Sequence, residues 1–423
     1  TAFWTAYSPG EGKLYLASTT DNALLPSANK GAKTEIWNYD GVKWQDVTPP
    51  NVPLYSNGAD TYQGNYWLTF IPGTTNTYVT ALRAAGTIKV VDGKVVTSYV
   101  NGKTTPLNDK YKPTPALDSE GNLWLAQSYK SSTKSVAVLP RDKFLSATAP
   151  VPGDWYVSNI PGMDVSAFKA SSFVISKGTD IKVFSSGAFG KAVFMWNNKG
   201  DITNTNPDKI WFYQFKSTDY KAIKWDYVFT LNAMSDGEVW MGYDAGAIKF
   251  DPSHAWDPDF RVARILLPVD GLQVNALCEE PDGTKWVGTN MDGIYHMSAD
   301  GTQVLKHFNT DNSVLQSNQI YSMCYYPENK SLVIVTSNGV VEYFSDASAE
   351  VGEDSKVIVT PNPVRPDFTG FVTVMGLKND AQVAITDATG RAWYESTATA
   401  GKCEWDCCDS NGARVPAGNY TVV

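Results

Sequence analysis

The sequence predicts an all-β fold, a seven-bladed β-propeller followed by a small Ig-like β-sandwich. Three observations lead to this prediction. A unit that begins with glycine and continues with alternating aromatic and aliphatic residues recurs along the chain, and further alternating runs flank each copy. The unit no longer occurs after about residue 356, where shorter alternating runs follow. Apolar residues at the helical period, which would indicate a helical solenoid, do not form a stretch of any length.

The repeated unit places a glycine ahead of a short alternating strand. Its copies read Gly12-Lys-Leu-Tyr-Leu-Ala, Gly64-Asn-Tyr-Trp-Leu-Thr, Gly121-Asn-Leu-Trp-Leu-Ala, Gly178-Thr-Asp-Ile-Lys-Val, Gly237-Glu-Val-Trp-Met-Gly, Gly283-Thr-Lys-Trp-Val-Gly and Asn329-Lys-Ser-Leu-Val-Ile. Alternation with a period of two, bounded by Gly, Asp, Asn and Pro, marks strands joined by tight turns. Four strands in each repeat of roughly 40–50 residues is the pattern of a β-propeller. We therefore expect one blade per unit, with the repeated Trp packed between neighbouring blades.

Runs on either side of each unit supply the remaining strands. We expect the innermost strand before the glycine, as in Gln273-Val-Asn-Ala-Leu, and the third strand after the unit, as in Gly246-Ala-Ile-Lys-Phe. The last unit is followed only by Gly339-Val-Val-Glu-Tyr-Phe, so the propeller is expected to span 1–346 and an acidic linker 347–355. Propellers usually close by pairing the two chain ends. We expect the completing strand to belong before Thr1, and the chain to be the C-terminal piece of a larger protein.

Composition excludes several classes of protein. The 423 residues are 43% hydrophobic and 13% aromatic but only 19% charged, which supplies a sizeable core and excludes wholesale disorder. A net charge of −9 argues against a nucleic-acid-binding protein, because phosphate contacts need basic clusters. No apolar run is long enough for a membrane-spanning helix, and the first residues lack the basic start and apolar stretch of a signal peptide.

The region 356–423 reads as a separate, small β-sandwich. Short alternating runs, such as Gly370-Phe-Val-Thr-Val-Met and Ala381-Gln-Val-Ala-Ile-Thr, are joined by Thr-Gly and Asn-Gly turns. The sequence stops within an alternating run at Val423. We therefore expect the sandwich to be completed by one or two further strands.

The order of motifs in this region resembles the Ig-like C-terminal sorting domain of type IX secretion cargo. The motif residues are Pro361, Asn362, Pro363, Gly376, Asp387, Gly390, Trp405, Asp406, Asn411, Gly412, Gly418 and Tyr420. The Gly-x-Leu-Trp-Leu-type units are similar to two-component-regulator propeller repeats. Together they resemble the C-terminal half of a surface component of the type IX secretion attachment complex, in which two seven-bladed propellers precede the sorting domain. Cys407 and Cys408 depart from the family pattern, which usually has Gly-Arg there, and the usual final strand and basic tail are missing.

No residue pattern identifies a catalytic or metal site, and no cofactor is expected. His254, His296 and His307 stand without metal-ligand spacing and are interpreted as surface or strand-packing residues. Asp282-Gly-Thr-Lys-Trp lacks the spacing of a sialidase Asp-box, and no Gly-x-Ser-x-Gly elbow occurs. Asp-rich loops such as Trp256-Asp-Pro-Asp are interpreted as Asx turns, with calcium binding as the alternative.

The five cysteines do not indicate a disulfide framework. Cys278 and Cys324 occupy equivalent inner-strand positions of adjacent blades. At these positions the two Cα atoms are expected to be farther apart than the roughly 5.5–6 Å that a disulfide prefers, so we expect buried free thiols. Cys403, Cys407 and Cys408 surround one turn, and a bridge from Cys403 to either of the others is left open.

One face of the propeller is the best candidate for binding. Blades one to four have longer periods, so we expect large loops at 19–33, 71–85 and 127–134, and a further one at 216–226 entering blade five. These loops carry Tyr78, Arg83, Tyr129, Lys130, Lys134, Tyr220, Lys221, Lys224 and Trp225. Aromatic rings stack on sugar faces, and Lys and Arg pair with phosphate or carboxylate groups. Such a rim suits an anionic glycan or a partner protein, with merely solvated loops as the alternative.

The resemblance implies a non-enzymatic protein on the exterior of the outer membrane. It implies that the protein presents anionic lipopolysaccharide to the sortase that anchors cargo, and that the sorting domain docks to an outer-membrane partner. Two alternatives remain open. One is the carbohydrate-sensing periplasmic propeller of a hybrid two-component system. The other is a secreted propeller enzyme such as a lyase or glycosidase, which needs a convergent acid/base pair in the central pocket.

Overall fold

The computed structural model describes most of the chain. The described residues are 2–19, 35–52, 65–82, 86–100, 102–107, 114–126, 136–158, 170–186, 192–204, 211–216, 228–265, 269–345, 358–360, 363–364, 368, 370–375, 377, 381–398, 402–409 and 411–423. Two compact units are present, one formed by Thr1–Glu279 and Lys285–Tyr343, the other by Glu280–Thr284 and Phe344–Val423. The expected linker at 347–355 lies outside the described residues.

The first unit is a succession of antiparallel sheets, each of which we call a blade. Blade one is β1 (Ala2–Ser8), β2 (Lys13–Thr19), β3 (Glu35–Tyr39) and β4 (Trp44–Asp46). Blade two is β5 (Asn65–Phe70), β6 (Thr77–Leu82), β7 (Gly86–Val91) and β8 (Lys94–Tyr99). Blade three is β9 (Thr114–Leu117), β10 (Leu123–Ala126), β11 (Val136–Leu139) and β12 (Tyr156–Ser158). Blade four is β13 (Ala170–Ile175), β14 (Lys182–Ser186), β15 (Ala192–Asn197) and β16 (Trp211–Lys216). Blade five is β17 (Val228–Ala233), β18 (Val239–Tyr243), β19 (Gly246–Phe250) and β20 (Ala263–Ile265). Blade six is β21 (Val274–Glu279), β22 (Lys285–Thr289), β23 (Ile294–Met297) and β24 (Val304–Phe308), and blade seven is β25 (Ile320–Tyr326), β26 (Ser331–Thr336) and β27 (Gly339–Phe344).

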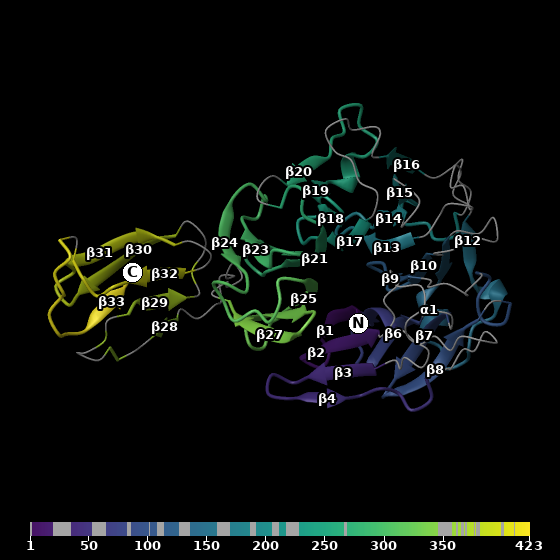
Figure 1. Cartoon of the computed structure of the whole chain (residues 1–423), viewed down its shortest axis with the longest axis horizontal. Coiled ribbons are helices and arrows are strands. Elements are labelled where there is room, and N and C mark those ends of the chain that lie inside the picture. The colour runs from purple at the N-terminus through teal and green to yellow at the C-terminus, as the bar shows by residue number, and fades with distance from the viewer. Residues whose placement is uncertain are drawn as a thin grey trace. The chain divides into compact units, whose positions relative to one another are not determined.

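The first strands of the blades follow one another around a closed ring (Figure 1). Each contacts the first strand of the next blade, and β25 contacts β1. Side chains join the two ends of the circuit, because Ser322 Oγ accepts the Thr5 amide at 3.1 Å and lies 2.6 Å from the Thr5 hydroxyl oxygen. The expectation of an all-β propeller is confirmed.

Buried tryptophans pack between neighbouring blades, as the repeat predicts. Trp124, Trp240 and Trp286 are fully buried on the second strands of blades three, five and six. Trp124 meets Trp196 of blade four edge to face at 5.3 Å, and Trp286 meets Tyr343 of blade seven at 5.4 Å. Their burial removes large apolar areas from water and holds adjacent sheets together.

Two positions explain the glycines of the repeated unit. Gly237 turns between the first and second strands of blade five with a φ of 92°, a conformation that favours glycine. Gly242 lies on β18 where an added Cβ would stand 2.7 Å from the carbonyl oxygen of Val274 in blade six. The first glycine therefore permits the turn, and the last permits close approach of the next blade.

The register expected for blade two is wrong. The Gly64 unit forms β5, the first strand of its blade, whereas the other copies form second strands. The second strand is β6, which pairs with both β5 and β7 and follows a turn at 71–76. Residues 77–82 of the expected loop at 71–85 are therefore strand, because alternation alone does not distinguish one strand of a blade from the next.

The second unit contains two three-stranded sheets. One has the order β28 (Ile358–Thr360), β29 (Val372–Met375) and β32 (Lys402–Trp405), and the other β31 (Ala392–Thr397), β30 (Gln382–Asp387) and β33 (Tyr420–Val422). Alternate residues of both sheets, among them Val374, Val383 and Trp405, are buried in a shared core.

Helical structure is minor in the described residues. It comprises α1 (Arg141–Leu145) and two single 3₁₀ turns, η1 (Pro152–Asp154) and η3 (Pro252–His254). Within the described part of the chain, no helix has the length and apolar character needed to cross a membrane.

Candidate functional site

The structure corrects one of the predicted binding residues. Tyr78 lies within β6 and is 3% exposed, with its ring 5.8 Å from that of Tyr15 and 5.7 Å from that of Phe70. Burial raises the pKa of its hydroxyl. The expected rim position is wrong because Tyr78 belongs to a central strand of blade two. The other rim candidates lie outside the described residues: Arg83, Tyr129, Lys130, Lys134, Tyr220, Lys221, Lys224 and Trp225.

We call one end of the blades the loop face. Here the first strand of each blade begins and the second strand turns into the third. In blades five to seven the connections at 244–245, 269–273, 290–293, 309–319 and 337–338 are described. We call these connections of blades five to seven the described arc of the loop face.

Inner strands begin on the loop face with a recurring β-bulge. The register shifts at Phe229 in β17, at Asn275 in β21 and at Tyr321 in β25. A bulge leaves one residue outside the ladder and re-aims its side chain. Trp67 and Ser171 are the bulged residues of β5 and β13. Sequence reasoning missed these positions, although in blades five to seven they stand at one fixed offset before the repeated unit.

Polar side chains at this face form a hydrogen-bonded chain in blades six and seven. Gln273 Nε2 donates to Asn275 Oδ1 at 2.7 Å, and Asn275 Nδ2 lies 3.4 Å from Asn290 Oδ1. Gln319 Nε2 donates to the same Asn290 oxygen at 2.9 Å, and the Tyr321 hydroxyl donates to Gln319 Oε1 at 3.3 Å. We call these five residues the amide relay. All five are half-buried, and none is charged at neutral pH.

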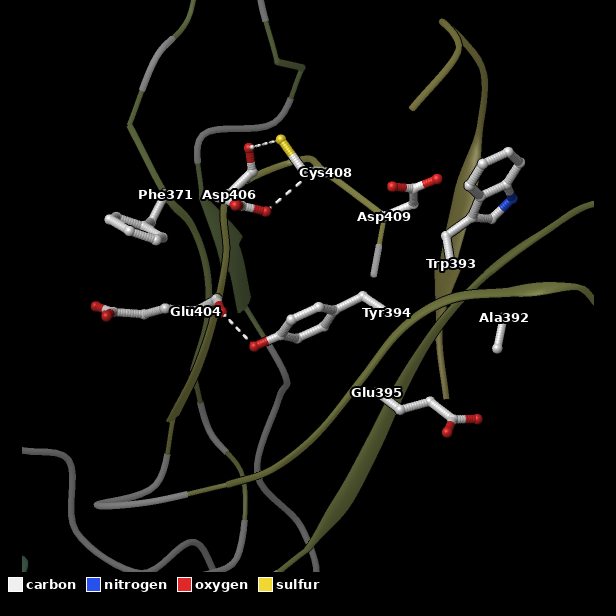
Figure 2. Close-up of a pocket in the computed structure, with 9 residues that line it drawn as sticks. All are labelled: Phe371, Ala392, Trp393, Tyr394, Glu395, Glu404, Asp406, Cys408 and Asp409. Carbon is white, nitrogen blue, oxygen red and sulfur yellow. Dashed lines mark hydrogen bonds between the residues drawn. The ribbon is translucent and has the colours of Figure 1, made fainter. Parts of the chain in front are cut away.

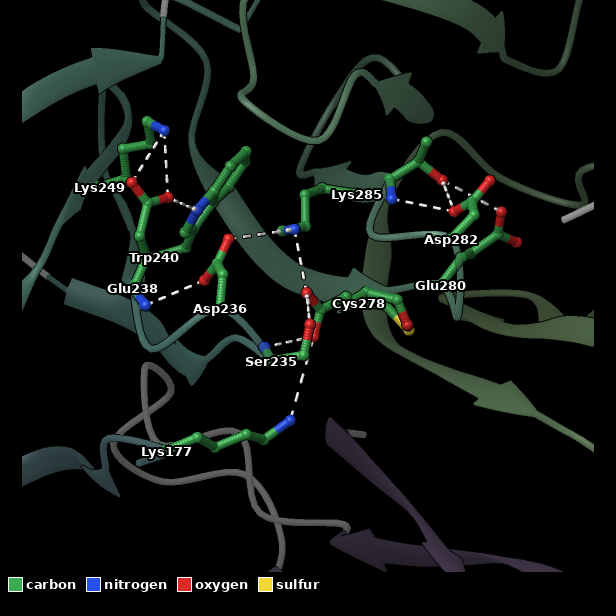
Figure 3. A network of polar contacts seen from close by, with 12 residues as sticks. Lys177, Ser235, Asp236, Glu238, Trp240, Lys249, Cys278, Glu280, Asp282 and Lys285 are labelled. Atoms are coloured by element: carbon green, nitrogen blue, oxygen red, sulfur yellow. Dashed lines mark hydrogen bonds and ion pairs between the residues drawn. The ribbon is translucent and has the colours of Figure 1, made fainter. Parts of the chain in front are cut away.

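The opposite end of the blades carries a network of charges instead (Figure 3). Lys285 is 1% exposed and pairs with Glu279 at 3.0 Å and Asp236 at 3.9 Å. Glu279 also accepts the Ser235 amide at 2.7 Å, and Lys177 of blade four approaches it at 4.0 Å. These groups satisfy one another across three blades, so we interpret the network as structural.

The described sorting-motif residues build turns of the second unit. Asp387 Oδ1 accepts from the Thr389 amide and hydroxyl at 2.8 and 2.6 Å, and Asp387 Oδ2 accepts from Trp393 Nε1 at 2.8 Å. The Thr389 and Trp393 hydrogen bonds lower the pKa of Asp387 to about 2. Gly390, with a φ of 82°, completes this turn.

Further motif residues form hydrogen bonds elsewhere in this unit, and Tyr420 pairs with Asp387 in the ladder between β30 and β33. The Tyr420 hydroxyl donates to the Pro416 carbonyl at 2.6 Å, and Trp405 Nε1 donates to the Cys408 carbonyl at 2.8 Å. Asp406 Oδ1 accepts the Cys408 amide at 2.9 Å. The remaining described motif residues are Pro363, Asn411, Gly412 and Gly418, while Pro361, Asn362 and Gly376 lie outside the described residues. The motif thus includes residues that determine the local fold.

A hollow of about 660 Å³ opens on the second unit (Figure 2). It is lined by Phe371, Ala392, Trp393, Tyr394, Glu395, Glu404, Asp406, Cys408 and Asp409. The Tyr394 hydroxyl donates to the Glu404 carbonyl at 2.7 Å across it. Four carboxylates in one hollow disfavour an anionic ligand there.

The histidines and cysteines do not converge on a centre. His254 is exposed beside Asp257, whose hydrogen bond raises the histidine pKa, while His296 and His307 stack on Trp286 and Tyr295. All five cysteines are free, so the bridge from Cys403 left open by the sequence is not formed. Across the described ranges, no three His, Cys, Asp or Glu side chains are grouped to hold a metal ion.

Comparison with known proteins rests on structure. No protein-family model matches the chain, and no curated protein matches it. The solved structure of PorZ, an essential bacterial surface component of the type-IX secretion system of Porphyromonas gingivalis, is similar at 22% identity with a TM-score of 0.67. The similarity covers 99% of this chain and 56% of that one.

Two other solved structures share the architecture. The extracellular domain assigned to the hybrid two-component system BT3049 of B. thetaiotaomicron is similar at 11% identity with a TM-score of 0.53, covering 96% of this chain and 51% of that one. The Myceliophteria thermophila Cps50 (Swd1) β-propeller domain is similar at 10% identity with a TM-score of 0.51, covering 81% and 97%. At these identities the likeness shows the fold, and the chain spans about half the length of the first two structures.

Proposed function

We propose that this chain is a non-enzymatic, surface-exposed binding module of a type IX secretion attachment machinery. The observation that carries the proposal is the extent of the likeness to PorZ. It covers 99% of the chain, and so includes both the propeller and the second unit. The order of the sorting-motif residues supports the same assignment independently of the propeller, whose fold serves many functions.

In this proposal the second unit docks to other components of the machinery. Asp387 and Tyr420 support it, since each orients a turn through short hydrogen bonds and presents a defined surface. A sortase and an outer-membrane protein are the proposed partners. The carboxylate-lined hollow makes this unit a poor place for an anionic glycan.

The propeller is proposed to hold an anionic glycan such as lipopolysaccharide, or a partner protein, at its loop face. The amide relay supplies neutral hydrogen-bonding groups there. Arg83, Lys130, Lys134, Lys221 and Lys224, which lie outside the described residues, would supply the positive charge. A site of this kind binds and presents its ligand without acid/base chemistry.

Location and association in the producing cell test this assignment. The tagged native protein is expected to be cleaved by protease added to intact cells and to co-purify with the sortase after cross-linking. A matched strain with tagged maltose-binding protein in the periplasm controls for leakage and adventitious capture. Protection from added protease, or the absence of the sortase from the cross-linked material, would contradict the proposal.

A sensor propeller is the second candidate, because the likeness to the BT3049 domain covers 96% of this chain. That protein class signals across the inner membrane, so its periplasmic location distinguishes it from a surface component. A propeller enzyme is the third candidate. Turnover of a polysaccharide by the purified chain would favour it over both binding functions.

A further inference from the structure

The hydrogen-bond direction of the amide relay is set by one backbone group. Asn275 Nδ2 donates to the carbonyl oxygen of Ile320 at 2.9 Å, and a carbonyl oxygen can only accept. The Asn275 side-chain oxygen therefore accepts from Gln273, and the same Asn275 amide group donates toward Asn290 Oδ1. Bulging of β25 at Tyr321 leaves this carbonyl beside the neighbouring blade.

This direction leaves a donor at one place in the relay and an acceptor at another. Asn290 Oδ1 accepts hydrogen bonds from the side-chain amides of both Asn275 and Gln319, so the Asn290 NH₂ group faces away from these two residues. Gln273 donates through Nε2, which leaves its Oε1 as an acceptor. Neither the Asn290 NH₂ nor Gln273 Oε1 hydrogen-bonds to another described residue, and both side chains are half-buried. Half-buried groups held in one orientation are what a small-ligand site requires.

The chemistry of these groups selects hydroxyls. A hydroxyl both donates and accepts, so adjacent hydroxyls match an outward NH₂ and an outward carbonyl oxygen. Formal charge is absent from the five side chains, and the nearby Asp292 already accepts from the Tyr295 hydroxyl.

We infer that the loop face of blades five to seven binds an uncharged, hydroxyl-rich stretch of saccharide through the Asn290 NH₂ group and Gln273 Oε1. The inference rests on the proposed glycan-binding function and deepens it by naming the part of the glycan that this arc contacts.

The decisive variant is Asn290→Asp in the full chain. It keeps an oxygen toward Asn275 and Gln319 and replaces only the outward NH₂ with a second oxygen. Binding is measured on an array of uncharged gluco-, manno- and galacto-oligosaccharides, followed by calorimetry with the tightest of them. We expect at least about tenfold weaker binding, the loss for one hydrogen bond to a ligand hydroxyl.

Two further variants keep the test sharp. Asn312→Asp makes the same change of charge on an exposed residue of the neighbouring 309–319 connection, and it should bind as the native protein does. Asn290→Ser removes the amide without adding charge, and should bind as weakly as Asn290→Asp. Thermal unfolding of each variant establishes that the propeller is folded.

The outcomes separate this inference from the proposed function. Failure of the native protein to bind any uncharged oligosaccharide overturns the inference, as does equal binding by the native protein and folded Asn290 variants. Salt-sensitive binding of anionic lipopolysaccharide in either case leaves the proposed function standing. Peptide capture by this arc in place of saccharide also overturns the inference.

Discussion

The ammonium group of Lys182 lies 4.3 Å from the centre of the Trp124 ring, so a lysine of the fourth blade covers a tryptophan of the third. Lys182 Nζ also donates to Asn198 Oδ1 at 2.8 Å, and the residue is 1% exposed. Lys285 repeats the arrangement over Trp240, at 5.7 Å, between blades six and five. A buried cation on the tryptophan of the preceding blade is therefore part of how these blades pack.

Burial makes the contribution of Lys182 depend on pH. It lowers the pKa of Lys182 to about 8 from an ordinary value of 10.5, so the unfolded chain binds the proton more tightly than the folded protein does. Stability must then rise with pH between these two values. We expect the free energy of unfolding of the native protein, relative to Lys182→Met, to increase by up to about 3 kcal/mol across this range. Urea unfolding at pH 7.5 and 10 would contradict this if the difference stayed constant.

Close approach of the blades is tested at Gly242. An added Cβ would meet the Val274 carbonyl oxygen and Cγ1 at 2.7 Å, both in the next blade. We expect Gly242→Ala to lower the free energy of unfolding by about 1–3 kcal/mol. Gly153→Ala is the matched control, because nothing lies within 4 Å of its added Cβ. Equal free energies of unfolding for the two variants in denaturant would contradict this, because the added Cβ at position 242 would then be accommodated between the blades without loss of stability.

Acid should loosen the second unit through Asp387. Hydrogen bonds from Thr389 and Trp393 lower its pKa to about 2, against 3.8 ordinarily. The stabilisation is therefore present above pH 3.8 and lost as the pH falls through 2. We expect pepsin to cleave this unit in the native protein increasingly between pH 4 and 2, and to cleave it in Asp387→Asn already at pH 4. If pepsin cleaved Asp387→Asn with the same pH dependence as the native protein, the role assigned to Asp387 would be contradicted. Asp92→Asn in the propeller is the control, and its second unit should be cleaved as in the native protein.

Positive charge on the loop face is tested by Lys221→Ala combined with Lys224→Ala. Removing two cations should weaken binding of anionic lipopolysaccharide and flatten its dependence on salt, because fewer counterions are displaced. Lys43→Ala combined with Lys94→Ala removes the same charge from exposed positions at the periphery of blades one and two. If both double variants bind equally, the lysines at 221 and 224 are not part of the site.

Periodicity revealed the propeller because each blade is built alike. It failed at the Gly64 unit, where an alternating run with the right composition forms the first strand of its blade. Tyr78 was misplaced for the same reason, since a shift of one strand moved a buried residue into an expected loop. Local alternation does not encode which neighbour a strand pairs with.

No sequence pattern predicted the amide relay. Its members come from two blades and meet only because bulges at Asn275 and Tyr321 reorient the chain. Asp387 and Gly390 were found from sequence because their turn is local, within a few residues. A site formed by residues close together in the sequence can be predicted from the sequence, whereas a site assembled by the fold from distant residues cannot.

Direct binding of the purified full chain to anionic lipopolysaccharide, at low and at high salt, tests the central claim most directly. The account predicts binding at low salt that weakens strongly at high salt, because exposed charges are screened. It also predicts that neutral saccharide competes for part of the same face. Failure to bind at either salt concentration, or binding that salt does not change, would contradict a glycan-presenting propeller.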